Sequence, residues 1–318
     1  MINNPECVAC GSRRWEDLGR RMFRASDLER ADEYTRKRLR VLFEAWIPRA
    51  LEAEFAFVMC GDCGFVTFVP RPNEGELREK YRILAEQGDP GYNAAADDEG
   101  EDRRARALFR ALAPFAGGSR TRILDYGGGN GRLLLPFARR GCDCCVVDYN
   151  DSPLPGIRRL ASVLDEVPEG ARFDLIVCSH VLEHLGDPAS MLCRLGRHLQ
   201  EGGFAYFEVP VEIWKGPPRM SEPVTHINFF TESTLRILLE RCGFVARRSG
   251  TSRHPDLRRR MAVAHVVAQR NGASDSTDTG AGVEETRRLM SPSWAARLRR
   301  AFWYPDLIPG AVWRRMTR

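Results

Sequence analysis

The sequence predicts an α/β fold organised around a doubly wound parallel sheet. An apolar run ends on Asp125 and passes at once into a glycine-rich turn at residues 127–131, and a helical pattern follows over residues 133–140. The next apolar run ends on Asp148, at the distance at which such a sheet places a ribose-binding carboxylate. Glycines allow positive φ and close ligand approach, and the first amides of the following helix are unpaired. These features predict a nucleotide-like cofactor at the carboxyl ends of the two strands.

The spacing of the glycines selects among cofactors. The dinucleotide pattern G-x-G-x-x-G, read from Gly127 and Gly129, would need a third glycine at the position of Arg132. The pattern acid-x-G-x-G-x-G fits instead, because Asp125 is followed by Gly127, Gly129 and Gly131. A nicotinamide or flavin cofactor is therefore not expected.

This pattern resembles that of class I S-adenosylmethionine-dependent methyltransferases. Residues 173–184 resemble the fourth strand of that family and the helix after it, residues 202–210 resemble its fifth strand, and residues 226–244 resemble the helix and sixth strand that follow. The resemblance covers roughly residues 100–270, about half the chain. It implies a Rossmann-like, seven-stranded sheet and S-adenosyl-L-methionine as cofactor.

The resemblance also implies which residues meet the cofactor. At the matching positions, Asp125 serves the amino group of S-adenosylmethionine indirectly, Asp148 the two ribose hydroxyls, and the glycines let the backbone pass against the cofactor. The expected cofactor-binding residues are Asp125, Gly127, Gly128, Gly129, Gly131, Asp148, Tyr149, Leu164, Cys178 and Ser179.

Three histidines are candidates for a catalytic or binding role toward the methyl acceptor. Methyl transfer is an in-line displacement, so a base is needed only if the nucleophile arrives protonated, and imidazole titrates near neutrality. We expect His226 and His180 to be the catalytic candidates and His184 to orient a helix or contact substrate, with a capping or packing role as the alternative for His226. His180 and His184 lie four residues apart at a predicted helix start, on one face. The H-E-x-x-H order of a zinc protease is absent, so a catalytic metal is not favoured.

Two aromatic residues are candidates for substrate contact. Trp214 lies in the proline-rich loop 211–225 after the fifth strand, at the sheet edge where an acceptor would bind. Tyr92 lies in a segment rich in Gly, Asp and Ala at residues 86–102, which could close over the site; an exposed loop aromatic is the equal alternative.

The N-terminal region predicts a zinc-ribbon-like module over residues 1–85. It contains two C-x-x-C pairs, each followed by a glycine, a pattern typical of a structural zinc site closed by four thiolates; the metal ligands are Cys7, Cys10, Cys60 and Cys63. Unrelated turns or redox pairs are the alternatives. Residues 26–57 between the pairs predict mostly amphipathic helix, which would pack on the catalytic domain or form a homodimer surface. The module resembles the front end of certain bacterial methyltransferases that act on nucleotide-linked sugars.

The C-terminal region divides into a predicted linker and a basic tail. We expect the catalytic domain to span residues 86–270 and residues 271–285 to be a flexible linker. Residues 286–318 form a basic, aromatic and amphipathic tail that would contact an anionic membrane, a partner protein or its own domain.

Bulk properties narrow the function. The net charge of +5 is small and the sequence shows no broad basic stripe, so no nucleic-acid partner is expected. Without an apolar run of about 20 residues or a signal pattern, we expect a cytoplasmic protein with reduced or metal-bound cysteines. The leading hypothesis is a methyltransferase acting on oxygen or carbon of a small molecule, such as a nucleotide-linked sugar. A non-catalytic scaffold and an RNA or protein methyltransferase are the alternatives.

Overall fold

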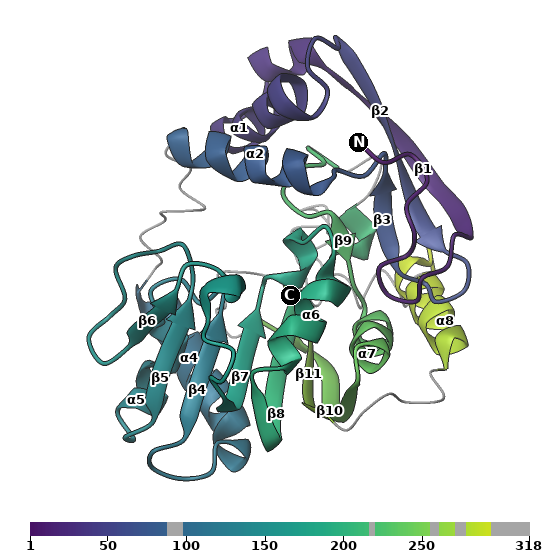
Figure 1. The fold of residues 1–318 in the computed structure, drawn as a ribbon. Coiled ribbons are helices and arrows are strands. Elements are labelled where there is room, and N and C mark those ends of the chain that lie inside the picture. Colours follow the sequence, from purple (N-terminus) through teal and green to yellow (C-terminus); the bar gives the residue numbers. More distant parts are fainter. Residues whose placement is uncertain (88–97, 216–219, 255–260, 271–277, 294–318) are drawn as a thin grey trace, which may run out of the picture.

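The computed structural model describes residues 1–87, 98–215, 220–254, 261–270 and 278–293. Within these residues there are two β-sheets (Figure 1): a sheet of seven strands in the lower half of the view and a sheet of four strands above it. The candidate substrate contact Tyr92 and residues 294–318 of the predicted tail lie outside the described residues.

The seven-stranded sheet has the strand order β10-β11-β8-β7-β4-β5-β6. Its strands are β4 (Arg122–Tyr126), β5 (Asp143–Val147), β6 (Arg158–Ala161), β7 (Phe173–Ser179), β8 (Leu199–Pro210), β10 (Phe244–Arg253) and β11 (Ala262–Arg270). The strands from β6 to β8 are parallel, whereas β11 runs antiparallel between β8 and β10. The chain order reverses between β4 and β7, so the switch point at which such sheets bind ligands lies beside the glycine turn. The predicted seven-stranded α/β sheet is confirmed.

Helices cover both faces of this sheet because the central strands are apolar on both sides. Leu108 and Leu112 of α4 (Asp98–Leu112) pack with Ile123 of β4, together with α5 (Leu135–Ala138). The opposite face is covered by α6 (Pro188–Gly196) and α7 (Glu232–Arg241), whose leucines share a core with Leu124. Consecutive residues of a strand thus point to different helices. A 3₁₀ turn over Ala113–Phe115 follows α4.

The helix after the glycine turn is shorter than the predicted 133–140. A 3₁₀ turn, Arg132–Leu134, comes first, and α5 follows over Leu135–Ala138 with a proline in its first turn. Proline lacks an N–H and is tolerated best at that position, so the α-helix begins there. Gly141, at φ 84°, lies in the turn that leads to β5.

The four-stranded sheet belongs mainly to the N-terminal module. It has the order β1-β2-β3-β9, with β1 (Trp15–Arg24), β2 (Glu52–Cys60), β3 (Val66–Val69) and β9 (Asn228–Phe229). Three helical pieces, Ala25–Glu29, α1 (Glu33–Val41) and the π-helix Leu42–Trp46, join β1 to β2, and α2 (Glu74–Glu86) follows β3.

The prediction of helix across residues 26–57 is wrong at its C-terminal end. Residues 52–57 belong to β2, where Phe55 and Phe57 are buried while Glu52 and Glu54 are exposed. This alternation has the period of two that favours a strand. In residues 52–57 it outweighs the helical spacing of apolar residues that is found earlier in the segment.

The two sheets are joined through β9, so residues 1–85 and 86–270 are not independent units. The strand β9 begins two residues after His226 and pairs with β3 of the N-terminal module. The ring of Phe229 packs 5.2 Å from Phe57 and 5.0 Å from Phe68, measured between centroids. The N-terminal module therefore holds the end of the loop that carries the candidate base.

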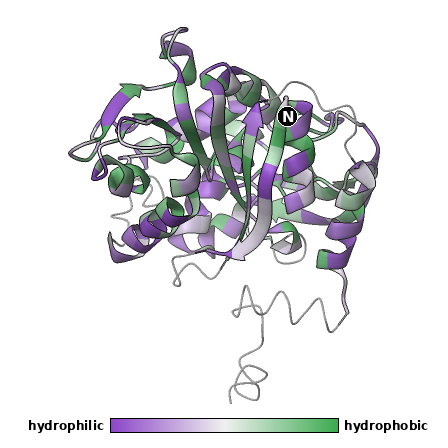
Figure 2. Ribbon diagram, turned by 90° about the horizontal axis from the view of Figure 1, so that it is seen from below, coloured by the Kyte–Doolittle hydropathy of each residue, from purple (hydrophilic) through white to green (hydrophobic). Residues whose placement is uncertain are grey.

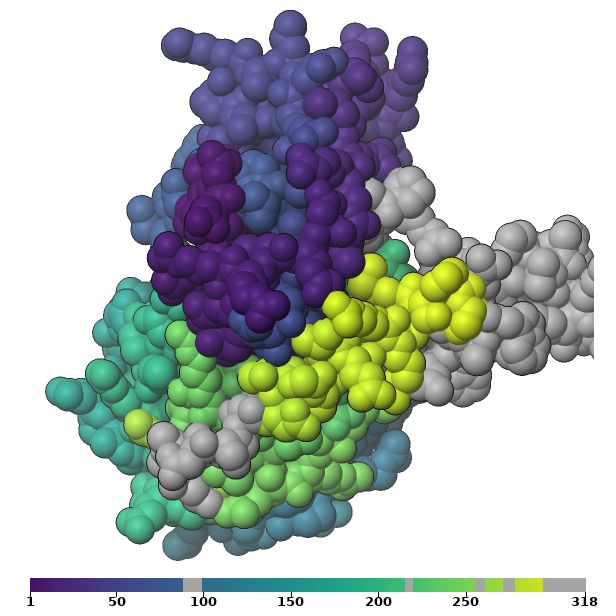
Figure 3. All heavy atoms as spheres, turned by 90° about the vertical axis from the view of Figure 1, so that its right-hand side faces the viewer, coloured from purple at the N-terminus to yellow at the C-terminus, as the bar shows by residue number. Residues whose placement is uncertain are grey.

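The linker predicted over residues 271–285 is wrong in its second half. Residues Thr279–Met290 form α8, which lies against the N-terminal residues (Figure 3). Thr286 donates its hydroxyl to the Gly64 carbonyl at 2.8 Å, and a Cβ added at Gly282 would lie 2.2 Å from the Cys63 carbonyl oxygen. Glycine and serine composition suggested flexibility, but here Gly282 allows close packing on the second C-x-x-C turn.

Figure 2 shows hydrophobic stretches along the strands in the middle of the molecule and many hydrophilic residues on the helices around them. Among the described residues, no helix combines the length and the apolar character needed to cross a membrane.

Candidate active site

The glycine turn follows β4 and has the backbone that its sequence requires. Gly127, Gly129 and Gly131 have φ values of 73°, 56° and 80°, a region that residues with a side chain rarely adopt. A Cβ at Gly127 would lie 2.5 Å from Cγ2 of Val181, and one at Gly131 would lie 2.5 Å from Cγ2 of Ile157, whereas one at Gly129 would meet nothing within 4 Å. The outer glycines are therefore needed for packing, and Gly129 faces open space where a cofactor can approach the backbone.

Asp125 lies beneath this turn and is 1% exposed. Among the described residues its Oδ2 atom has no hydrogen-bond partner, and a Cβ at Gly128 would lie 2.4 Å from that atom. Burial raises the pKa of Asp125 to about 7. A buried carboxylate oxygen without a hydrogen bond is costly, so this group fits a role opposite a cationic part of a ligand.

Asp148 follows β5 and faces the same turn. Its Oδ2 accepts a hydrogen bond from the Gly129 amide at 2.9 Å, and its Oδ1 accepts one from the Asn150 amide at 2.8 Å. The next residue, Tyr149, is 66% exposed, and Leu164 is buried in the 3₁₀ turn Leu164–Glu166 after β6. The structure thus brings the two predicted acids and the glycines together at the carboxyl edge of the sheet.

The last two predicted cofactor residues, Cys178 and Ser179, end β7. Their side chains make contacts with other residues of the protein. The thiol of Cys178 is fully buried in the core. The Ser179 hydroxyl donates to Oε1 of Glu208 at 2.7 Å and accepts from Nη2 of Arg104 at 2.6 Å.

Arg104 and Glu208 form a buried ion pair that the sequence analysis missed. Nη2 of Arg104, on α4, lies 3.1 Å from Oε1 of Glu208, on β8, and the Tyr206 hydroxyl donates to Oε2 of Glu208 at 2.7 Å. Burial alone would raise the pKa of Glu208, but His180 and Arg104 hold it well below its usual value. The signal in the sequence was a glutamate among the apolar and aromatic residues of the second half of β8.

The predicted helix start at residues 180–184 is wrong, because His180 has a φ of 58° and turns the chain at the end of β7. A 3₁₀ turn over Leu182–His184 follows, and α6 begins only at Pro188, capped by Asp187. The two histidines therefore do not share one helix face.

His180 and His184 contact Glu183 in different ways. Nδ1 of His180 lies 3.3 Å from Oε1 of Glu183 and Nε2 of His180 lies 3.5 Å from Oε1 of Glu208, whereas Nε2 of His184 lies 3.8 Å from Oε1 of Glu183. Burial alone would lower the pKa of His180, but the two glutamates raise it above its usual value.

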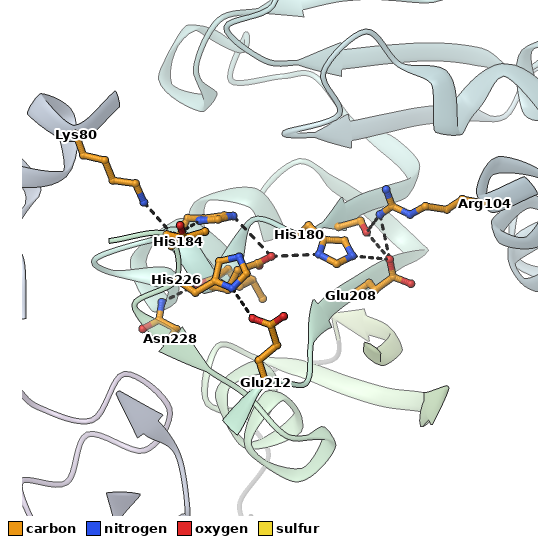
Figure 4. A network of polar contacts seen from close by, with 12 residues as sticks. Lys80, Arg104, His180, His184, Glu208, Glu212, His226 and Asn228 are labelled. Atoms are coloured by element: carbon orange, nitrogen blue, oxygen red, sulfur yellow. Dashed lines mark hydrogen bonds and ion pairs between the residues drawn. The ribbon is translucent and has the colours of Figure 1, made fainter. Parts of the chain in front are cut away.

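His226 and His184 come together on the acceptor side of the sheet (Figure 4), with ring centroids 4.8 Å apart. Nδ1 of His226 donates to Oε2 of Glu212 at 2.9 Å, and Nδ1 of His184 donates to the Thr225 carbonyl at 2.8 Å. Burial lowers the pKa of His184 to about 3, so its ring is neutral. Glu212 is a second residue that the sequence analysis missed.

The N-terminal module supplies three side chains to this region. Nζ of Lys80 donates to the Thr225 carbonyl at 3.0 Å, Nε of Arg38 donates to the Thr225 hydroxyl at 3.2 Å, and the Tyr34 hydroxyl lies 2.8 Å from that hydroxyl. The helices α1 and α2 thus brace the residue before His226. No motif indicated these contacts, because they join residues more than a hundred positions apart.

Trp214 lies in the 3₁₀ turn Ile213–Lys215 and is 5% exposed. It belongs to the hydrophobic core, so its side chain anchors the loop to the core and offers little surface to a substrate.

The four cysteines of the N-terminal module form one cluster. The sulfurs of Cys7 and Cys63 are 3.5 Å apart, those of Cys10 and Cys60 are 3.6 Å apart, and all four lie within 4.8 Å of one another. Tetrahedral zinc with Zn–S bonds of about 2.3 Å requires sulfurs about 3.8 Å apart. The two turns also match, because the amides of Gly11 and Gly64 donate to the carbonyls of Cys7 and Cys60. The cluster fits a closed, four-thiolate metal site.

Comparisons with known proteins agree with this architecture. Residues 99–248 match the family profile of the methyltransferase domain. The ubiquinone biosynthesis O-methyltransferase of Acinetobacter baylyi is 29% identical over 101 residues, and that of Hahella chejuensis is 32% identical over 99 residues. Each match covers 27% of this chain and 42% of the relative, so the chain spans less than half the length of these curated proteins.

A solved structure resembles a larger part of the chain. The 1,6-didemethyltoxoflavin-N1-methyltransferase of Burkholderia thailandensis, with bound 1,6-didemethyltoxoflavin and S-adenosylhomocysteine, superposes with a TM-score of 0.52 at 22% identity. The superposition covers 66% of this chain and 97% of that one. Residues 99–248 thus match the methyltransferase-domain profile, and the seven-stranded sheet has the class I fold of S-adenosylmethionine-dependent methyltransferases.

Proposed function

We propose that this protein is an S-adenosylmethionine-dependent methyltransferase that acts on oxygen or carbon of a small molecule. The observation that carries the proposal is the glycine turn at the switch point, with the open face of Gly129 beside it and, beneath it, the buried carboxylate of Asp125, whose Oδ2 makes no hydrogen bond within the described residues. Packing explains Gly127 and Gly131, but a scaffold that had lost cofactor binding would have no need of a glycine at position 129 or of a buried acid at position 125.

The residues of the turn divide the binding of S-adenosylmethionine between them. Asp125 provides negative charge for the amino group, Asp148 provides acceptors for the ribose hydroxyls, and Gly129 leaves space for the cofactor against the backbone. Tyr149 and Leu164 would border the adenine. When bound, the cofactor supplies an electrophilic methyl group on a sulfonium.

On the acceptor side, His226 is the residue that handles the proton of the acceptor. Glu212 holds Nδ1 of His226 at 2.9 Å, which fixes the ring and leaves Nε2 for the acceptor. His180 lies between two glutamates, 3.3 Å and 3.5 Å away, so its part is to position the end of β7 near the reacting groups. His184 orients the Thr225 carbonyl and with it the backbone before His226.

The small-molecule class of acceptor is supported by the matched relatives, whose names place them in ubiquinone biosynthesis and on 1,6-didemethyltoxoflavin. A nucleotide-linked sugar remains our proposal for this chain, and it rests on the resemblance of the four-cysteine module to that group of enzymes. The four cysteines would hold a structural zinc ion, since all four positions are filled by the protein.

Calorimetric titration with S-adenosylhomocysteine tests the cofactor half of the proposal. The wild-type protein should bind about one equivalent, and Gly129→Val should lose binding. Gly118→Val is the matched control, because Gly118 also faces open space but lies outside the turn and needs no positive φ. If the wild-type protein binds no cofactor at millimolar concentration, the non-catalytic scaffold is correct.

A transfer assay tests the acceptor half. The protein is incubated with isotope-labelled S-adenosylmethionine and a set of nucleotide-linked sugars and hydroxylated aromatic compounds, and methylated products are measured by mass spectrometry. Methylation of RNA or protein alone, with none of the small molecules modified, would contradict a small-molecule acceptor.

A further inference from the structure

We propose that Glu183, His184 and His226 form a binding site for one divalent transition-metal ion, separate from the four-cysteine cluster. One ligand atom from each residue lies within 4.8 Å of the other two. Glu183 and His184 come from the turn after β7 and His226 comes from the end of the loop before β9, so tertiary structure alone brings them together.

The hydrogen bonds of the two histidines orient them as metal ligands. The Thr225 carbonyl can only accept, so Nδ1 of His184 carries the proton and Nε2 carries the lone pair. Glu212 fixes His226 in the same way, through Nδ1 at 2.9 Å. A ligating histidine nearly always donates its other ring nitrogen to a carbonyl or carboxylate, and both histidines do so here.

Glu183 supplies the third ligand. It is 1% exposed, and neither of its carboxylate oxygens makes a hydrogen bond in the described part of the chain, while Nδ1 of His180 lies 3.3 Å from Oε1. Its Oε1 lies 3.8 Å from Nε2 of His184. His180 offsets part of the cost of burying this carboxylate, and a cation between Glu183 and the imidazoles of His184 and His226 would offset more of it.

The charges around the site allow a cation. Glu183 and Glu212 bring two negative charges to the site. The nearest cations are directed partly to other groups: Nζ of Lys80 lies on the Thr225 carbonyl, and His180 is shared between Glu183, 3.3 Å away, and Glu208, 3.5 Å away. A second cluster, His180, Glu208 and His254, is also compact. There the Arg104 guanidinium already lies 3.1 Å from Glu208 and fills the place of a cation, so we assign no metal to it.

Two imidazoles and one carboxylate favour zinc, iron or another first-row divalent ion, and they leave coordination positions open. Together with the proposed function, this site would bind an oxygen of the acceptor and lower the pKa of its hydroxyl, the established effect of a Lewis acid on a bound oxygen. With the ion bound, His226 would be a ligand through Nε2 and the proton released by the acceptor hydroxyl would pass to solvent; without the ion, His226 would take that proton itself, as in the proposed function.

Cobalt binding tests the site without any substrate. Equilibrium dialysis of the full-length protein against Co²⁺ should give two equivalents per chain, one with thiolate charge-transfer absorption from the cysteines and one with only weak d–d bands. Glu183→Gln and His226→Ala should each lose the second equivalent and keep the first. Glu212→Gln should weaken the second site by about 10–100-fold, the usual effect of removing such an orienting group.

The control is His265→Ala, which removes a partly exposed histidine of β11 outside the cluster and should keep both equivalents. Titration of each variant with S-adenosylhomocysteine reports folding and the proposed function independently of the metal. A wild-type protein that binds only the thiolate-ligated equivalent, or variants that still bind two, would overturn the proposal. Loss of cofactor binding with cobalt binding intact would instead count against the proposed function.

Discussion

The two halves of the candidate active site are built in different ways. The cofactor half consists of one continuous turn and the acid that follows the next strand, and its contacts are made largely by backbone groups, such as the Gly129 amide on Asp148. The acceptor half is assembled from side chains of four separate segments, with Lys80 and Arg38 from the N-terminal module meeting Thr225, beside His184 and His226.

This difference indicates which half of the site determines specificity for the acceptor. A backbone turn can hold a common cofactor on many chains, whereas the acceptor half depends on the N-terminal module and on the pairing of β3 with β9. We therefore expect changes in the cofactor half to alter cofactor affinity, and changes in the acceptor half to alter turnover and acceptor affinity.

The sharpest test of this separation is His226→Ala. We expect kcat to fall by about 10²–10⁴, the usual contribution of a group that manages proton transfer, while the Kd for S-adenosylhomocysteine changes less than about twofold. Steady-state kinetics and calorimetry measure the two quantities. Equal losses in both would mean that the halves are not separable.

Gly127→Val should have the next largest effect. The added Cβ would lie 2.5 Å from Cγ2 of Val181 at a φ of 73°, so we expect a loss of about 2–5 kcal/mol in the free energy of unfolding from crowding and backbone strain. Gly129→Ala has no such neighbour and should cost only about 1–2 kcal/mol. Urea denaturation compares the two, and equal costs would show that packing does not distinguish these glycines.

A pH series tests Asp125. Its pKa of about 7 means that the carboxyl is neutral below that pH and ionised above it, and a cationic amino group on the ligand favours the ionised form. The affinity for S-adenosylhomocysteine should therefore rise about tenfold from pH 6 to pH 8 and level off above pH 7.

The ligand amino group also loses its proton, at a pH above that at which Asp125 titrates, so Asp125→Asn is the control that separates the two titrations. This variant should bind more weakly at pH 8 and should lack the rise. A rise of equal size in the variant would assign the titration to another group.

The smallest effect is expected from Tyr34→Phe. The Tyr34 hydroxyl lies 2.8 Å from the Thr225 hydroxyl, and the residue is 44% exposed, so the loss of one hydrogen bond should cost at most about 1 kcal/mol. We expect a modest rise in KM for the acceptor with no change in cofactor affinity. A change in cofactor affinity alone would contradict the assignment of this contact to the acceptor half.

Local sequence was sufficient for the cofactor half. An acid at a strand end and glycines at every second position impose a particular backbone path through φ values that other residues avoid, so Asp125 and Gly127–Gly131 could be recognised without neighbours. The four cysteines were recognisable for a similar reason, because two residues between thiolates bring both to one ion. The local pattern failed at residues 180–184, where a helix was expected and the positive φ of His180 made a turn.

The sequence by itself thus determined the α/β class, the place of the glycine turn and the cysteine cluster, because each depends on residues close together in the chain. Only the tertiary structure decided that α8 packs on the second C-x-x-C turn, that β9 joins the two sheets, and that Glu183, His184 and His226 converge. These contacts join segments far apart in the sequence, and their formation depends on burial and partner geometry that no local spacing encodes.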